Sequence, residues 1–153
     1  MKLSTRGRYA VMAMADLASQ PNMGESGMEA LAGIARRQEI SLAYLEQLFS
    51  KLRRGRLVAS LRGPGGGYRL ARPAAELRIA DIVRAVDEPL KATRCRTAKG
   101  CLGKGGRCLT HDLWDELGLH IETFLSSVTL ADVVEKSVKG RARNSSPAQS
   151  VVA

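Results

Sequence analysis

Residues 41–72 read SLAYLEQLFSKLRRGRLVASLRGPGGGYRLAR, and this stretch decides the fold. In its first half, leucine and phenylalanine recur every three or four positions, which predicts a helix with one apolar stripe. Ser41 is a favourable N-cap for that helix, and Gly55 is a stop signal. In its second half, two short alternating segments flank the turn sequence RGPGGG, so residues 57–72 are expected to form a β-hairpin.

Two further helices are expected before this stretch. Apolar periodicity predicts the first over residues 6–19 and the second over residues 28–36, with a tight turn leading into Ser41. Two helices joined by a short turn match the helix-turn-helix plan, and a hairpin directly after the second helix corresponds to a wing. The expected fold class is therefore mainly α with a small β-hairpin, a winged helix-turn-helix domain followed by a long C-terminal dimerisation helix.

Basic residues are concentrated in the same region. The chain carries 24 Lys and Arg against 15 Asp and Glu, a formal net charge of +9. Residues 36–72 hold nine of the basic and two of the acidic side chains. This surface favours a nucleic acid as partner, although charge alone describes a solvated basic face equally well. The glycine-rich turn is not interpreted as a nucleotide-binding loop, because a second strand follows it and no Lys-Ser or Lys-Thr pair does.

The sequence changes character after the wing. A short helix is expected within LRIADIVRAVDEP, and residues 91–108 then combine six basic side chains, four glycines and three cysteines with no acid. From residue 110 onward, apolar residues recur at threes and fours in a long stripe. We expect this helix to bury its stripe against a second copy of the chain in a two-fold dimer, the alternative being its own winged domain.

All three cysteines lie within fourteen positions, as Cys95-x5-Cys101-x6-Cys108, and His111 follows. Thiols clustered in this way in a cytosolic protein are typical of a metal site. Three thiolates and one imidazole suit either tetrahedral zinc or an iron–sulfur cluster, and the loose spacing leans toward two irons without excluding zinc. A Cys108–His111 nucleophilic dyad is disfavoured, because nothing indicates a pocket or a third orienting residue, so no enzymatic activity is expected.

The expected organisation follows from these segments. It comprises a winged helix-turn-helix DNA-binding domain (1–88), a cluster-binding loop (89–109), a dimerisation helix with a short terminal helix (110–138) and a disordered tail (139–153). No apolar run approaches the roughly 20 residues that span a bilayer, and the first residues lack a signal-peptide pattern. We therefore expect a cytoplasmic protein with no membrane association.

The sequence resembles the family of winged-helix sensors of iron, sulfur and nitric oxide, and within it the regulators of iron–sulfur cluster assembly. The matching stretches, which span about residues 1–138, are KLSTRGRYAV, ISLAYLEQLFSKLRRGRLVASLRGPGGGY, AVDEP, ATRC, CLTHDLW and TLADVV. The resemblance implies one 2Fe–2S cluster per subunit, with the ligands Cys95, Cys101, Cys108 and His111. The second gap between cysteines is one residue longer than in the best-known relatives, which changes the expected path of the loop more than the expected ligation.

The same resemblance implies which residues contact DNA. In the recognition helix they are Ser41, Tyr44, Glu46 and Gln47, and in and around the wing they are Arg53, Arg62, Gly63 and Gly65. A carboxylate repels phosphate and pairs with a donor such as cytosine N4, so Glu46 is expected to discriminate between operator classes.

From these observations and the resemblance, we expect a homodimeric transcription regulator that binds a palindromic operator in double-stranded DNA. It would sense iron–sulfur cluster status, control iron–sulfur assembly genes and have no small-molecule substrate. Two alternatives stay open: a zinc-stabilised winged-helix regulator without redox sensing, and an iron–sulfur electron-transfer or cluster-delivery protein. The three differ in metal content and in operator preference.

Overall fold

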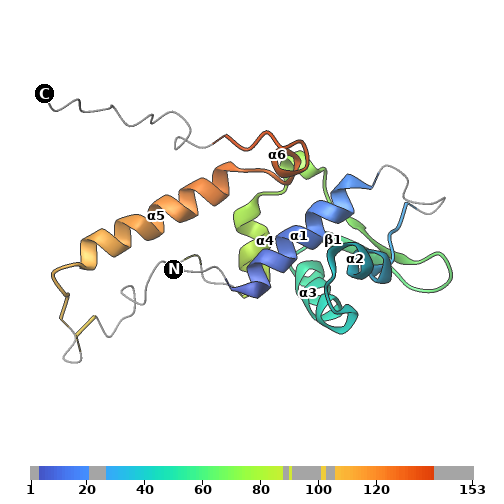
Figure 1. Cartoon of the computed structure of the whole chain (residues 1–153), viewed down its shortest axis with the longest axis horizontal. Coiled ribbons are helices and arrows are strands. Elements are labelled where there is room, and N and C mark those ends of the chain that lie inside the picture. The colour runs from blue at the N-terminus through green and yellow to red at the C-terminus, as the bar shows by residue number, and fades with distance from the viewer. Residues whose placement is uncertain (1–3, 21–26, 88–89, 91–100, 103–105, 140–153) are drawn as a thin grey trace, which may run out of the picture.

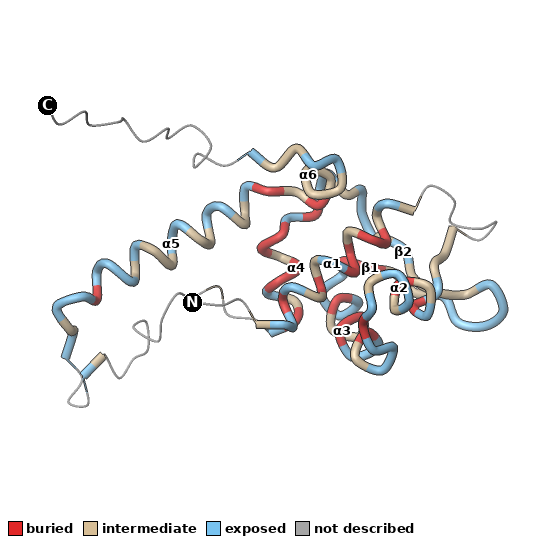
Figure 2. Tube along the Cα trace, viewed as in Figure 1, coloured by how far each residue is buried: buried red, intermediate tan, exposed pale blue. Residues whose placement is uncertain are grey.

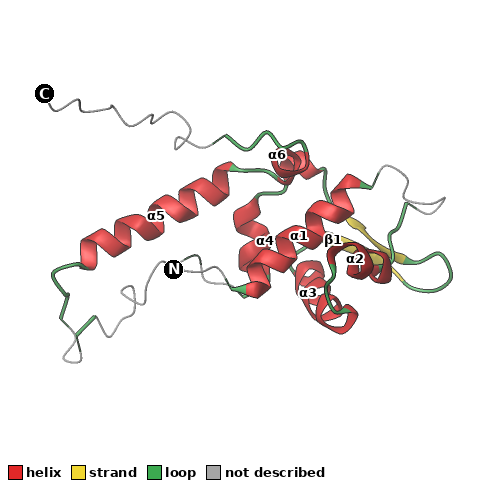
Figure 3. Ribbon diagram, in the orientation of Figure 1, coloured by secondary structure: helices red, strands yellow, loops and turns green. Residues whose placement is uncertain are grey.

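The computed structural model describes residues 4–20, 27–87, 90, 101–102 and 106–139. The described elements are α1 (Thr5–Ser19), α2 (Leu31–Gln38), α3 (Leu42–Arg54), β1 (Val58–Leu61), β2 (Gly67–Leu70), the 3-10 helix η1 (Ala74–Glu76), α4 (Ile79–Ala85), α5 (His111–Ser127) and α6 (Leu130–Val134). Helices dominate and one hairpin lies beside them (Figure 3), so the predicted fold class is confirmed. Nearly all of the expected tail and most of the cluster-binding loop lie outside the described residues. Within the described part of the chain, every helix is too short or too polar to cross a membrane.

The second helix begins later than the periodicity predicts. α2 starts at Leu31 rather than at residue 28, and it ends at Gln38. The reason is a backbone pairing between segments distant in sequence. The Glu29 amide donates to the Tyr68 carbonyl at 2.9 Å, and the Tyr68 amide donates to the Glu29 carbonyl at 2.8 Å. The chain before α2 is therefore extended against β2, which adds a short third partner to the antiparallel β1–β2 pair.

The helices α1 to α4 enclose one apolar core. Its largest fully buried side chains include Met14 and Leu17 from α1, Ile34 from α2, Phe49 from α3 and Ile82 from α4. Figure 2 shows buried stretches on α1, α3 and α4 where these helices lie close together. Burial of this apolar surface is the main favourable contribution to the stability of the fold.

The C-terminal end of α5 is tied to the same core. The Leu130 amide donates to the Leu77 carbonyl at 2.8 Å, and the Ile79 amide donates to the Val128 carbonyl at 3.0 Å. α6 then begins with a capping box and packs against α1. The core therefore includes α6, which the sequence grouped with the dimerisation helix. We call α1 to α4, η1, both strands and α6 the body.

The long helix α5 extends away from the body (Figure 1). Within α5, all of whose residues the structure describes, only His111 is buried. Glu122 in its C-terminal half pairs with Arg84 of α4 at 2.5 Å, while Leu113 and Phe124 remain exposed. The alternative in which α5 buries its whole apolar stripe on its own domain therefore does not describe this chain.

Candidate nucleic-acid interface and metal centre

α3 presents a polar face that begins at its N-cap. The Ser41 hydroxyl accepts a hydrogen bond from the Tyr44 amide at 3.4 Å, as its N-cap role predicts. The ring of Tyr44 packs edge-on against Tyr9 of α1, with ring centroids 6.1 Å apart, so Tyr44 is half-buried. Glu46 and Gln47 are exposed. The first turns of α3 therefore offer polar side chains to a partner while the opposite face of the helix is fixed in the core.

The wing, residues 57–72, is attached to α3 at two points. Arg53 Nη1 on α3 donates a hydrogen bond to Ser60 Oγ on β1 at 3.2 Å. The rings of Phe49 and Tyr68 meet edge to face with centroids 5.0 Å apart, and this contact joins α3 to β2. Both strands of the wing therefore hold a defined position relative to the recognition helix.

The turn of the wing requires glycine for its own backbone geometry. Gly63 and Gly65 have φ angles of +98° and +71°, which L side chains rarely adopt. A Cβ atom at Gly66 would collide with the backbone carbonyl of Leu61. The turn is exposed, and Arg62 lies at its entry, also exposed. A cationic side chain is thus presented where the hairpin projects from the body.

The structure brings the residues expected to contact DNA to α3 and to the adjoining wing. Seven of these eight residues are exposed, and Tyr44 is half-buried. A helix exposed along one face, with a hairpin fixed beside it, is the arrangement with which winged helix-turn-helix domains approach a duplex.

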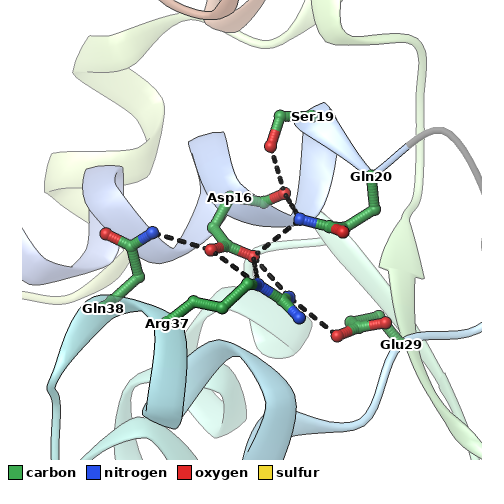
Figure 4. Close-up of polar contacts among 6 residues, drawn as sticks. All are labelled: Asp16, Ser19, Gln20, Glu29, Arg37 and Gln38. Atoms are coloured by element: carbon green, nitrogen blue, oxygen red, sulfur yellow. Dashed lines mark hydrogen bonds and ion pairs between the residues drawn. The ribbon is translucent and has the colours of Figure 1, made fainter.

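Sequence reasoning missed a buried ionic cluster that joins α1, α2 and the extended chain before α2 (Figure 4). Asp16 is only 6% exposed. Arg37 Nη2 lies 2.6 Å from Asp16 Oδ1 and 2.7 Å from Glu29 Oε1, and Gln38 Nε2 donates to Asp16 Oδ2 at 2.7 Å. The available signal was an acidic residue on the apolar face of α1, three positions after the buried Ala13.

The charge state of Asp16 is set by two opposing effects. Burial by itself would raise the pKa of this carboxyl, but hydrogen bonds from Arg37, Gln38 and Gln20 together with the charge of Arg37 lower the pKa below its ordinary value of 3.8. The hydrogen bonds that Arg37 donates to Asp16 and Glu29 raise the pKa of the Arg37 guanidinium. The pair is therefore ionised, and together with Glu29 it fixes α2 and the extended chain before α2 to α1.

Two of the predicted metal ligands meet at the start of α5. Cys101 Sγ lies 2.9 Å from His111 Nδ1, and the His111 side chain is in the first turn of the helix. The Cys101 amide donates to the Gly106 carbonyl at 3.1 Å, and the His111 amide donates to the Cys108 carbonyl at 3.1 Å. The hydrogen bond between Cys101 and Gly106 brings the two ends of this loop together. Cys108 therefore lies beside Cys101, although the gap between these two cysteines is one residue longer than in the best-known relatives.

Cys108 lies in an environment that favours its thiolate. A hydrogen bond with Thr110, at 3.6 Å between Sγ and Oγ1, and a second with Cys101 lower the pKa of the Cys108 thiol. Trp114 Nε1 donates to the same Thr110 oxygen at 3.2 Å, which leaves the hydroxyl hydrogen available to the sulfur. The thiolate is the form of cysteine that binds metals.

The described donors fit a soft metal group but do not complete its ligand set. Cys95 lies outside the described residues. Among the described residues, no three Cys, His, Asp or Glu side chains are arranged closely enough to hold a metal ion together. The pairwise contacts nevertheless gather Cys101, Cys108 and His111, two sulfurs and one imidazole, and this donor chemistry suits zinc or iron–sulfur clusters.

An apolar surface lies on α5 beyond these candidate ligands. Leu113 is 60% exposed, Trp114 38% and Phe124 42%, and Leu117 and Ile121 between them are half-buried. The spacing of three and four places them along one side of the helix. Exposed apolar surface of this extent marks an interaction site on a helix that leaves its own domain.

The fold and the exposed recognition helix define a winged-helix DNA-binding protein, and comparison with known proteins agrees. The model of the Rrf2 family, described as iron-dependent transcriptional regulator, matches residues 3–136. The chain belongs to the Rrf2 family, and the resemblance found in its sequence is confirmed.

Individual relatives narrow the comparison. The chain is 52% identical over 134 residues to the HTH-type transcriptional regulator IscR of Serratia proteamaculans, covering 88% of this chain and 79% of that protein. Its structure is similar to T. potens IscR, with a TM-score of 0.70, 36% identity and coverage of 94% and 96% of the two chains. It is also similar to CymR, the global cysteine regulator of B. subtilis, with a TM-score of 0.72, 31% identity and coverage of 89% and 98%. The chain is accordingly a DNA-binding transcriptional regulator and not an enzyme.

Proposed function

We propose that this regulator is a homodimer that senses iron–sulfur cluster status through a 2Fe–2S cluster and controls iron–sulfur assembly genes. The observation that carries the proposal is the 2.9 Å distance between Cys101 Sγ and His111 Nδ1. The Cys108 thiol lies at the same place, hydrogen-bonded to Thr110 and Cys101. The identity to a regulator named IscR supports the same assignment.

In this proposal Cys95, Cys101 and Cys108 supply thiolates and His111 supplies an imidazole nitrogen. When bound, the cluster supplies a redox-active pair of irons whose presence distinguishes two forms of the regulator. A histidine ligand makes such a site sensitive to protons and more labile than four thiolates would. His111 is also the first residue of α5, so a ligand bound to its imidazole ring would fix the position of the start of that helix.

Operator recognition is assigned to α3 and the wing. Ser41, Tyr44 and Gln47 would contact base edges and phosphates in the major groove, and Arg62 would follow the backbone from the wing. Glu46 would penalise operators that offer no hydrogen-bond donor to its carboxylate. A two-fold dimer presents two copies of α3, so the operator would be palindromic, with half-sites about 34 Å or a multiple of it apart.

Metal content tests the sensing part of the proposal. Anaerobically purified protein should be coloured and contain about two iron and two sulfide per chain. His111→Ala should shift or bleach the visible spectrum, whereas His120→Ala should not, because His120 is exposed and pairs with Glu116 on the solvent side of α5. Colourless protein with stoichiometric zinc would establish the zinc-stabilised regulator instead.

Sedimentation tests the dimer. Phe124→Glu places a charge on the exposed apolar side of α5 and should convert the dimer to a monomer. Thr123→Glu is the matched control, because the neighbouring residue is also exposed but lies on another side of the helix. If both variants sediment as dimers, α5 is not the dimer interface.

A further inference from the structure

Within the part of the chain that the structure describes, the acidic side chain of Asp87 lies among cations where three helices of the body end or begin. Asp87 follows α4, and its Oδ2 lies 2.6 Å from Lys51 Nζ of α3. The Asp87 side chain is 71% exposed and that of Lys51 is 32% exposed. An ion pair this open to solvent contributes little to stability. Stability therefore does not explain why Lys51 of the recognition helix is paired with an acid.

The packing of the helix ends explains why charges gather there. A Cβ atom at Gly55 would stand 3.1 Å from the Cβ of Ala85, so the C-terminal ends of α3 and α4 touch. The Tyr9–Tyr44 ring contact brings the first turns of α1 to the polar face of α3. Figure 1 shows the start of α1 beside the end of α4, and these two helices are in contact. Arg6, one turn before Tyr9, is therefore on the same side as the ends of α3 and α4.

The electrostatics agree with this arrangement. The hydrogen bond from Lys51 lowers the pKa of Asp87 most, and the positive charges of Arg6 and Arg54 lower the pKa further. We call Arg6, Lys51 and Arg54 the cationic triad. Asp87 and the cationic triad, taken as these four described residues, carry a net charge of +2.

The cationic triad continues the face of α3 that is expected to read DNA. Tyr44, Gln47, Lys51 and Arg54 follow one another at spacings of three and four, which is one stripe along a helix. Gln47 and Arg54 are seven residues apart, about 10 Å along the axis. Cations next to a base-reading surface lie where the sugar-phosphate backbone borders the groove.

We propose that Arg6, Lys51 and Arg54 bind a phosphate of the DNA backbone, and that Asp87 is an internal anion that competes with this phosphate for them. Phosphate contacts carry no sequence information, and they supply most of the affinity for unrelated DNA. Asp87 therefore lowers binding to unrelated DNA and leaves the base-reading side chains to decide where the regulator stays. This inference needs only the DNA-binding activity and does not depend on a cluster.

Asp87→Asn tests the competition with little change to the fold. Asp87 has a φ angle of +58°, a conformation that asparagine tolerates as well as aspartate. Binding of the cluster-free protein to a duplex of unrelated sequence, followed by fluorescence anisotropy, should strengthen about five-fold at ~0.1 M salt. The slope of log affinity against log salt, measured between about 50 and 200 mM, should steepen by about 0.9, as one added phosphate contact predicts.

Asp81→Asn is the matched control, since Asp81 is also a carboxylate of the α4 region that pairs with an arginine, Arg84, at 3.3 Å. It changes the net charge equally but leaves the cationic triad alone, so its affinity and salt slope should stay near those of the unchanged protein. Equal effects of the two substitutions would overturn the proposal, because the gain would then come from net charge alone.

A double substitution locates the effect. Lys51→Gln should weaken binding to the unrelated duplex, and Lys51→Gln combined with Asp87→Asn should lose most of the gain seen with Asp87→Asn. A gain that persists without Lys51 would place the phosphate elsewhere.

Discussion

The body buries most of its large apolar side chains, with Leu42 and Leu61 among the exposed ones, whereas α5 buries none of its own. The chain has two phenylalanines, and Phe49 in α3 is fully buried whereas Phe124 in α5 is 42% exposed. The body also pairs its buried carboxylate, Asp16, with Arg37. Isolated β-bridges join distant segments of the body, and a capping box satisfies the first turn of α6. Because α5 leaves so much apolar surface in water, we expect a partner outside its own chain to cover that surface. The body, in contrast, buries its apolar core and pairs its buried charge within the chain.

The largest expected effect compares the two phenylalanines directly. Phe49→Ala should lower the free energy of unfolding by about 3–5 kcal/mol, because a filled core site becomes a cavity and the contact with Tyr68 is lost. Phe124→Ala should change the unfolding of dilute protein by far less and should instead raise the dissociation constant of the dimer. Urea denaturation at two protein concentrations measures both quantities. Equal losses of stability in dilute protein would mean that α5 is buried within its own chain.

The next effect concerns the buried ionic cluster of the body. Asp16→Asn should cost about 2 kcal/mol of unfolding free energy, because the buried side chain at position 16 loses its charge and with it the ionic hydrogen bonds from Arg37. Asp81→Asn, at an exposed i,i+3 pair, should cost less than about 0.5 kcal/mol. Chemical denaturation of the two variants compares them. A negligible cost for Asp16→Asn would show that hydrogen bonds without charge suffice to fix α2 to α1.

The pH dependence of stability should separate the same two variants. The folded-state pKa of Asp16 is lowered, so its contribution is fully present above its unfolded pKa, about 3.8, and is lost as the pH falls through the lower folded value. The difference in unfolding free energy between the unchanged protein and Asp16→Asn should therefore shrink as the pH is lowered below about 4. Denaturation curves between about pH 6 and pH 3 measure this difference. A constant difference across that range would show that ionisation of Asp16 does not stabilise the fold.

The smallest effect tests the turn that leads into the recognition helix. Glu39 closes α2 with a φ angle of +53°, a left-handed conformation that costs a residue with a Cβ about 1–2 kcal/mol. Glu39→Gly should therefore raise the free energy of unfolding by about 0.5 kcal/mol, after the greater flexibility of glycine in the unfolded chain is subtracted. Glu39→Val should lower it. Thermal unfolding of both variants checks the sign, and a stabilising valine would contradict the strain.

Local features of the fold could be predicted from the sequence with useful accuracy. Ser41 was expected to cap the recognition helix, and its hydroxyl accepts from the Tyr44 amide. The RGPGGG turn was expected to join two strands, and β1 and β2 flank it. The expected start of α2 was wrong by three residues, because the pairing of Glu29 with Tyr68 joins segments that periodicity treats separately.

One of the candidate sites could be predicted from the sequence and the other could not. The spacing of Cys101, Cys108 and His111 predicted their association, because short loops bring neighbours in sequence together, while Cys95 lies outside the described residues. The cationic triad could not be predicted, because its members come from two helices separated by about 45 residues and meet a carboxylate from a third. Only the packing of those helices brings the four charges together.

By itself, the sequence determined where helices and the hairpin form and where the chain turns, and it predicted which thiols are candidate metal ligands, because each of these depends on interactions over a few residues. The tertiary structure decided the pairing of Asp16 with Arg37, the attachment of α6 to the body, the exposure of the α5 stripe and the position of Asp87 among cations. The physical reason is that burial and charge pairing across distant segments depend on how complete helices pack, and no local pattern records that packing.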